Sequence, residues 1–334
     1  MISHRILVPA MGVLALCASI GVVSAADSTM ELKQTIELKG KAGTMDHLAL
    51  DAKRDRLFVA NKVNNTLDIV DLKAGKLLTQ IRNQGGIQGI AYAADLDRVI
   101  VGLGTGGFCN FFDGEKYKQL ETLKFTDDSD NVRYDPRTQL VYVAHAEKSL
   151  GVVDAKNFQI KKDIKLPGAA EGFQIEKKRP RLYVNIPSPS EVVVIDTDKN
   201  EVMTRYKVEK AGGQHPMALD EENHRLFLGC RKKPMIVIMD SEDGKEIAGI
   251  DIPGEIDDLF LDTKNKRLYG SCGDGAIVVL KQTAPDKYEV VEKIETPKGA
   301  KTSYFDAETG RFFLAVPRQA GMNNPEVRIY QIKQ

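Results

Sequence analysis

The 334-residue sequence contains no tryptophan and only four cysteines. The absence of tryptophan argues against quinone cofactors that are made from that side chain. No two cysteines form a CxxC or CxxCH motif, so the sequence lacks attachment sites for covalent c-type haem and cysteine-based zinc sites. Neither sign of charge is in excess, with 47 basic and 47 acidic side chains. A nearly neutral chain gives no support for general binding to nucleic acid or to membrane surfaces.

Long apolar runs are also rare, because the sequence has only one, over residues 6–23. Arg5 precedes this run and small residues follow it, which predicts a secretory signal peptide over residues 1–26, cleaved after Ala25 or Ala26. An uncleaved membrane anchor is the alternative, since a run of this length can just span a bilayer. With cleavage, we expect a periplasmic or secreted monomer without a membrane span.

The mature part of the sequence is dominated by an internal repeat. An anchor residue closes a short apolar strand at intervals of 41 to 44 residues: Asp51, Ala93, Asp135, Glu176, Asp220, Asp262 and Asp306. Six anchors are followed five residues later by arginine, and the third by Leu140. A period near 42 residues with several short strands is typical of one propeller blade. The predicted fold is all-β: a seven-bladed β-propeller of four-stranded antiparallel blades over residues 27–334.

The last repeat has no room for a fourth strand after its third, at residues 327–332. Residues 32–38 precede the first anchor and belong to no repeat of their own. We therefore predict that this N-terminal strand becomes the outer strand of the last blade and closes the ring. Five repeats end their third strand with aspartate, which we interpret as a cap of the following turn: Asp71, Asp113, Asp154, Asp196 and Asp240.

Several second strands resemble the YVTN repeat of secreted seven-bladed propellers, the YncE-like proteins. The residues that carry this resemblance are Phe58-Val59-Ala60-Asn61 with Asn65 to Asp71, Tyr142-Val143-Ala144-His145, and Tyr183-Val184-Asn185. The resemblance covers the mature chain and implies the fold. Members of the family resemble the propellers of cytochrome cd1 nitrite reductase and quinoprotein dehydrogenases, and more distantly lactonases. The family has no invariant catalytic motif, so the resemblance implies no site residues.

A ring of polar residues marks a candidate site at one mouth of the propeller channel. Five residues before the anchors stand Asp46, Gln88, Asp130, Glu171, His215, Asp257 and Lys301, although the adjoining strands are apolar. The loops that carry them line the face on which propellers usually bind. Adding neighbours of the ring gives the candidate ligand-binding residues Asp46, His47, Asp130, Arg133, His145, Glu171, His215, Arg231, Asp257 and Lys301.

The chemistry of this mouth is open at the level of sequence. Solvation alone can account for a polar ring. Imidazole with carboxylates suits a divalent ion, for which His215, Glu171 and Asp257 are the candidate ligands. Arg133 stands on an apolar inner strand, so it either pairs with Asp130 or Glu171 or meets a ligand carboxylate. Cys230 and Cys272 share one register in adjacent blades, which places them too far apart for a disulfide.

Three classes of function remain. The first, which we favour, is an exported, non-catalytic propeller that binds an extracytoplasmic protein or a small polar ligand at the mouth. The second is a metal-dependent hydrolase or lactonase with its site in the mouth, where a metal or His215 activates water and Lys301, Arg231 or Arg318 holds an anionic substrate. The third is a redox partner or a propeller for a haem-d1-like cofactor, with His215 or His145 as the axial ligand.

Overall fold

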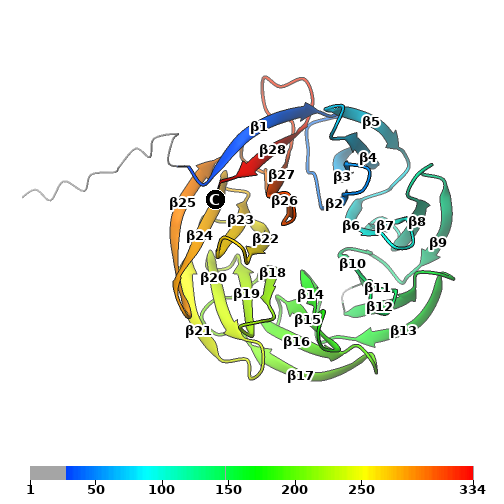
Figure 1. Ribbon diagram of the computed structural model, residues 1–334. Helices are drawn as coiled ribbons and strands as arrows, with labels where there is room; N and C mark the ends of the chain where they lie inside the picture. Colours follow the sequence, from blue (N-terminus) through cyan, green and yellow to red (C-terminus); the bar gives the residue numbers. More distant parts are fainter. Residues whose placement is uncertain (1–27, 147, 334) are drawn as a thin grey trace, which may run out of the picture.

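The computed structural model describes residues 28–146 and 148–333, so the predicted signal peptide lies outside the described residues. Seven four-stranded antiparallel sheets surround a central channel in chain order (Figure 1). This arrangement confirms the predicted fold class. Within the described part of the chain, no helix is long and apolar enough to cross a membrane.

Each blade runs from an inner strand beside the channel to an outer strand at the rim. The first three blades comprise β2 (Leu48–Asp51), β3 (Arg56–Asn61), β4 (Thr66–Asp71) and β5 (Lys76–Ile81); β6 (Ile87–Ala93), β7 (Arg98–Leu103), β8 (Phe108–Asp113) and β9 (Gln119–Lys124); and β10 (Val132–Asp135), β11 (Leu140–His145), β12 (Ser149–Asp154) and β13 (Gln159–Lys165). A short 3-10 turn, η1 (Lys62–Asn64), joins β3 to β4.

The remaining four blades repeat this order. They comprise β14 (Phe173–Ile175), β15 (Arg181–Ile186), β16 (Glu191–Asp196) and β17 (Glu201–Lys207); β18 (Gln214–Asp220), β19 (Arg225–Cys230), β20 (Met235–Asp240) and β21 (Glu246–Asp251); β22 (Ile256–Asp262), β23 (Arg267–Cys272), β24 (Ala276–Ala284) and β25 (Lys287–Glu295); and β26 (Thr302–Asp306), β27 (Arg311–Val316), β28 (Glu326–Ile332) and β1 (Met30–Glu37).

The core lies between blades rather than within them. All seven second strands have a partly exposed first residue followed by five buried ones. Their apolar side chains form seven clusters, each of which joins two neighbouring blades. Every blade contributes to two clusters, so every blade needs apolar residues on both of its faces. This requirement explains why the same apolar pattern repeats once per blade in the sequence.

The N-terminal strand closes the ring as predicted. β1 pairs antiparallel with β28, from Met30 opposite Ile332 to Glu37 opposite Glu326, and Figure 1 shows it outside β28 at the rim. The strand begins two residues before the predicted start at Leu32. Its inward side chains are buried in both of the clusters that flank the last blade.

The five aspartates that end third strands cap the following turns, as predicted. Each side chain accepts a hydrogen bond from a backbone N–H two or three residues later, for example Asp71 from Ala74 at 2.8 Å and Asp240 from Glu242 at 2.8 Å. These bonds satisfy backbone donors that the turn would otherwise leave free. The aspartates therefore have a structural role.

The recurring arginine connects each blade to the next one. Arg225 binds Asp286 of the following blade through its Nε and Nη2 atoms, at 2.6 and 3.1 Å, and Arg181 binds Glu242 at 3.0 Å. In the last blade, Arg311 reaches Asp55 of the first at 2.7 Å. The third repeat, with leucine at this position, uses Arg137 instead, which donates to Thr197 at 3.0 Å.

Candidate functional site

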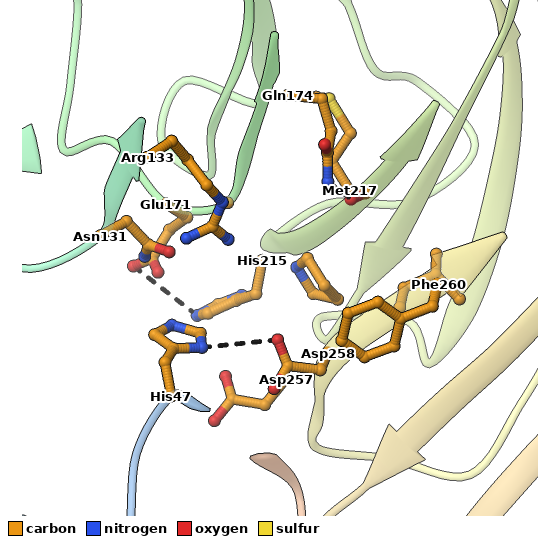
Figure 2. A pocket seen from close by; sticks show the side chains of 13 residues that line it. His47, Asn131, Arg133, Glu171, Gln174, His215, Met217, Asp257, Asp258 and Phe260 are labelled. Atoms are coloured by element: carbon orange, nitrogen blue, oxygen red, sulfur yellow. Dashed lines mark hydrogen bonds and ion pairs between the residues drawn. The ribbon is translucent and has the colours of Figure 1, made fainter. Parts of the chain in front are cut away.

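Two glycines bring neighbouring inner strands together at the channel mouth. The Gly89 N–H donates to the Asp130 carbonyl at 3.1 Å, and the Gly172 N–H donates to the His215 carbonyl at 2.9 Å. A Cβ atom at either glycine would lie only 2.1 or 2.5 Å from that carbonyl oxygen, which no side chain tolerates. The backbone therefore fixes where Asp130 and His215 project into the mouth (Figure 2 shows His215).

One group of charges at the mouth is fully paired. The Asp257 carboxylate binds Lys301 Nζ at 3.2 Å and also the Arg231 guanidinium, whose Nε donates to the Ile256 carbonyl at 2.8 Å. Burial acts to raise the pKa of Asp257, but the charges of Arg231 and Lys301 outweigh it and hold that pKa below its usual value. Asp257 is therefore ionised at neutral pH.

His47 is the centre of a second paired group. Its Nδ1 lies 3.4 Å from Asp258 Oδ1 and its Nε2 lies 3.7 Å from Asp46 Oδ1. Burial acts to lower the pKa of His47, but Asp258 and Asp46 together raise it to about 9. The imidazole is therefore cationic at neutral pH. Asp46 also binds Lys62 Nζ at 3.2 Å, and Asp258 accepts the Ser303 N–H at 2.7 Å.

Two carboxyl groups lack such partners. Glu171 Oε1 lies 3.9 Å from His215 Nε2. The His215 Nδ1–H donates to the Gly213 carbonyl at 2.8 Å, and burial together with Arg231 lowers the pKa of His215, so its Nε2 presents a lone pair rather than a proton. Among the described residues, the Asp130 carboxyl has neither a hydrogen-bond nor an ion-pair partner. Burial and neighbouring carboxylates raise the pKa of both acids to about 7.

Arg133 is the unpaired cation of the mouth. Its Nη1 donates to the Val132 carbonyl at 2.9 Å, and its guanidinium lies 5.5 Å from the centre of the Phe173 ring. In residues 28–146 and 148–333, no carboxylate lies within ion-pair distance of it. Burial consequently lowers the pKa of Arg133. Of the two alternatives that the sequence left open, pairing with Asp130 or Glu171 is not what the structure shows.

These groups surround two adjoining hollows. A cavity of about 40 Å³ is lined by Asn131, Arg133, Glu171, His215 and Asp257, among others, and Figure 2 shows these side chains converging on it. The central channel beneath it has a volume of about 480 Å³. The two hollows share five lining residues: His47, Arg133, Gln174, Asp258 and Phe260. A charged mouth thus opens onto a channel whose walls include Tyr92, Tyr304 and Phe305.

The structure brings nine of the ten candidate residues to this mouth, and His145 is the exception. His145 Nε2 lies 2.9 Å from Asp163 on the outer strand β13, and its ring stacks on Phe125 with centroids 4.6 Å apart. Its side chain is only 3% exposed. Because His145 ends a second strand, its backbone lies near the mouth, but its side chain packs between two blades.

Sequence reasoning missed Asn131, Gln174 and the aromatic channel wall as site residues. Asn131 follows the polar ring by one position, so a second polar register was the available signal. Gln174 interrupts an apolar inner strand, as Arg133 does, and its Nε2 donates to the Met217 carbonyl at 2.7 Å. The aromatic residues gave no signal, because large apolar side chains on inner strands equally suggest core.

No finding supports the proposed metal ligands His215, Glu171 and Asp257. Among the residues described, no group of three or more His, Cys, Asp or Glu side chains is arranged to hold a metal ion. The metal site therefore stays a prediction. Cys230 and Cys272 are free and buried, in agreement with the expectation that no disulfide joins them, and burial raises the pKa of each thiol to about 12.

Known proteins share about a quarter of their aligned residues with this chain. No protein-family model matches it. It is 25% identical over 192 residues to the uncharacterized protein YncE of Salmonella typhimurium, covering 56% of this chain and 53% of that protein. It is 28% identical over 132 residues to YncE of Escherichia coli O157:H7, covering 38% and 37%. The chain spans about half the length of the curated relatives it matches.

Solved structures show the same fold at lower identity. The WD40 repeats of RRP9 superpose with a TM-score of 0.78 at 11% identity, covering 91% of this chain and all of that one. A chain of Kuenenia stuttgartiensis hydrazine synthase superposes with a TM-score of 0.75 at 14% identity, covering 87% and 96%. These likenesses concern the fold alone. The chain is therefore a seven-bladed propeller with sequence similarity to the YncE proteins.

Proposed function

We propose that this protein is a non-catalytic binding protein that takes a small polar molecule at the mouth of its central channel. The observation that carries the proposal is Arg133, a guanidinium held in the channel wall without a carboxylate partner. A buried charge without a partner is costly. Because acidic side chains lie around the same mouth, a fold selected for stability alone would pair it. A ligand with a negative group would complete the pairing, which accounts for a buried cation without a carboxylate partner.

The proposal is tested by thermal unfolding with a library of small polar metabolites. We expect at least one compound, at about a hundred times its dissociation constant, to raise the Tm of the wild type by about 5 °C. Arg133→Gln should lose this shift, whereas the matched control Arg205→Gln should keep it, because Arg205 is exposed on the outer strand β17. Shifts that persist in Arg133→Gln, or no shift with any compound, would contradict the proposal.

Hydrolysis is a second candidate function, and one observation favours it. A neutral imidazole whose Nδ1–H is fixed by the Gly213 carbonyl presents its Nε2 lone pair beside Glu171, as a general base does. The test of this candidate is to recover the compound that raises the Tm after the assay and to analyse it for hydrolysis. A compound recovered unchanged supports binding alone, and a hydrolysed compound supports catalysis through His215. The haem and redox-partner alternatives stay predictions, as does a protein partner.

We also propose that the protein is exported, on the sequence pattern of residues 1–26. N-terminal sequencing of the native protein should find a first residue at position 26 or 27 in the periplasmic or secreted fraction. Recovery of residues 6–23 with the membrane fraction would show an anchor instead.

A further inference from the structure

Among the described residues, three charged groups of the channel mouth have no oppositely charged partner. Asp46, Asp257 and Asp258 each have at least one cationic neighbour within 4.0 Å. Arg133 is left as a cation without a carboxylate partner, and Asp130 and Glu171 as carboxyls whose pKa burial and neighbouring acids raise in spite of nearby cations. A ligand that completes this set needs one negative and one positive group.

Arg133 presents its free donors to one cavity. A guanidinium carries five N–H donors, and only one of those of Arg133 is used, by the Val132 carbonyl. The free edge of a guanidinium matches the two oxygens of a carboxylate, which it binds in bidentate fashion. Figure 2 shows this guanidinium pointing into the small cavity, on the same side as Asn131 and Glu171.

Asn131 supplies a second, independent observation at the same cavity. Its side chain is 3% exposed, it lines the small cavity, and its Oδ1 has no hydrogen-bond partner. Buried acceptors are nearly always satisfied, so an orphaned one requires an explanation. An ammonium group has three donors, which would satisfy Asn131 Oδ1 and the carboxyl of Glu171 together.

The size of the two hollows limits the ligand further. Arg133, Asn131 and Glu171 all line a cavity of about 40 Å³, so the two charged groups of the ligand must be only a few atoms apart. The adjoining channel of about 480 Å³ has mixed walls, with apolar side chains such as Ile90 and Phe260 and polar ones such as Gln174 and Ser303. Its volume falls in the range of ordinary small-molecule sites, about 300–1,000 Å³.

We infer that the ligand is a free amino acid. Its carboxylate binds Arg133, its ammonium group binds Glu171, Asp130 and Asn131, and its side chain extends down the central channel. This inference rests on the proposed function and specifies its ligand class. It also explains why Arg133 and the two acids remain apart: each holds the opposite end of one zwitterion.

Isothermal titration with the common amino acids, one at a time, tests the inference on the mature protein. The tightest binder is then compared with its carboxamide, which lacks the negative charge, and with its deamino analogue, which lacks the positive one. We expect each analogue to bind at least about tenfold more weakly than the amino acid. Arg133→Gln should weaken binding of the amino acid by a similar factor while changing the affinity for the carboxamide little. Arg205→Gln should change neither affinity.

The outcomes separate this inference from the function on which it rests. An analogue that binds as tightly as the amino acid would overturn the zwitterion, leaving a site for an anion or a cation. If no amino acid binds but a library compound still stabilises the protein through Arg133, the proposed function holds and the inference fails. If nothing binds, both fail.

Discussion

A protein that lacks residues 28–38 should unfold at a much lower urea concentration than the same protein with these residues present. β1 supplies the outer strand of the last blade, and its removal exposes β28 as a free edge. It also removes Met30, Ile36 and Leu38, which are 1–3% exposed, from two clusters of the core. Three such side chains and a strand of hydrogen bonds together contribute roughly 5 kcal/mol or more to the free energy of unfolding.

Two point substitutions in the same strand provide the matched comparison. Ile36→Ala should cost about 2–5 kcal/mol, since the side chain is 1% exposed, whereas Leu32→Ala should cost less than about 0.5 kcal/mol, since Leu32 is 46% exposed. Urea unfolding followed by circular dichroism measures both. A truncated protein with an unchanged midpoint, or equal costs at the two positions, would show that β1 is not needed to close the ring.

The fold could be predicted because its physical cause is periodic in the sequence. Apolar strands and turn-capping aspartates recur at one interval, and the last repeat lacks its fourth strand. Counting repeats was therefore enough to predict the seven blades and the closing strand. The role of the recurring arginine could not be predicted. In three repeats its partner lies 61 residues later, but that partner is a Tyr117 hydroxyl or a Glu242 or Asp286 carboxylate. In two other repeats the partner is a backbone carbonyl at another spacing, so no common residue type reveals it.

The candidate site was predicted in position but not in pairing. Register along the strands places a residue at the mouth, and this sufficed for Glu171, His215 and Asp257. Register does not say which way a side chain turns at a strand end, and His145 turns between two blades. Nor does it say which charges meet. Asp257 and Asp130 occupy equivalent positions, yet among the described residues Asp257 has two cationic partners and Asp130 has none within ion-pair distance.

This difference between equivalent acids predicts the second large effect. Neutralising an acid that lacks a cationic partner should increase the free energy of unfolding. Burial, Asp46 and Asp128 raise the pKa of Asp130 to about 7, while His47 and Lys62 act to lower it. Burial, Asp130 and Asp257 do the same for Glu171, against Arg231 and His47. Between about pH 4 and pH 7 the folded protein holds protons that the unfolded chain has lost, so these groups make stability fall as pH rises through that range.

Asp130→Asn and Glu171→Gln should therefore each stabilise the protein at pH 8, by about 2 kcal/mol, and change little near pH 4, where about half of the unfolded carboxyls are also protonated. The matched control is Asp257→Asn, which leaves Arg231 and Lys301 without their carboxylate and should cost about 2–3 kcal/mol at pH 8. Urea unfolding at the two pH values measures all three differences in unfolding free energy.

The same two stabilising variants should bind the ligand more weakly, and that combination is what distinguishes a site from a solvated ring. A carboxyl group that only contacts water has no functional reason to be buried at a cost to stability. A carboxyl group that binds the ammonium group of a ligand has such a reason. If Asp130→Asn destabilises the protein at pH 8 as Asp257→Asn does, Asp130 has a cationic partner and the unpaired acids that define the site do not exist. If it stabilises the protein and leaves binding unchanged, the ligand does not contact Asp130, and Glu171 alone holds the positive end.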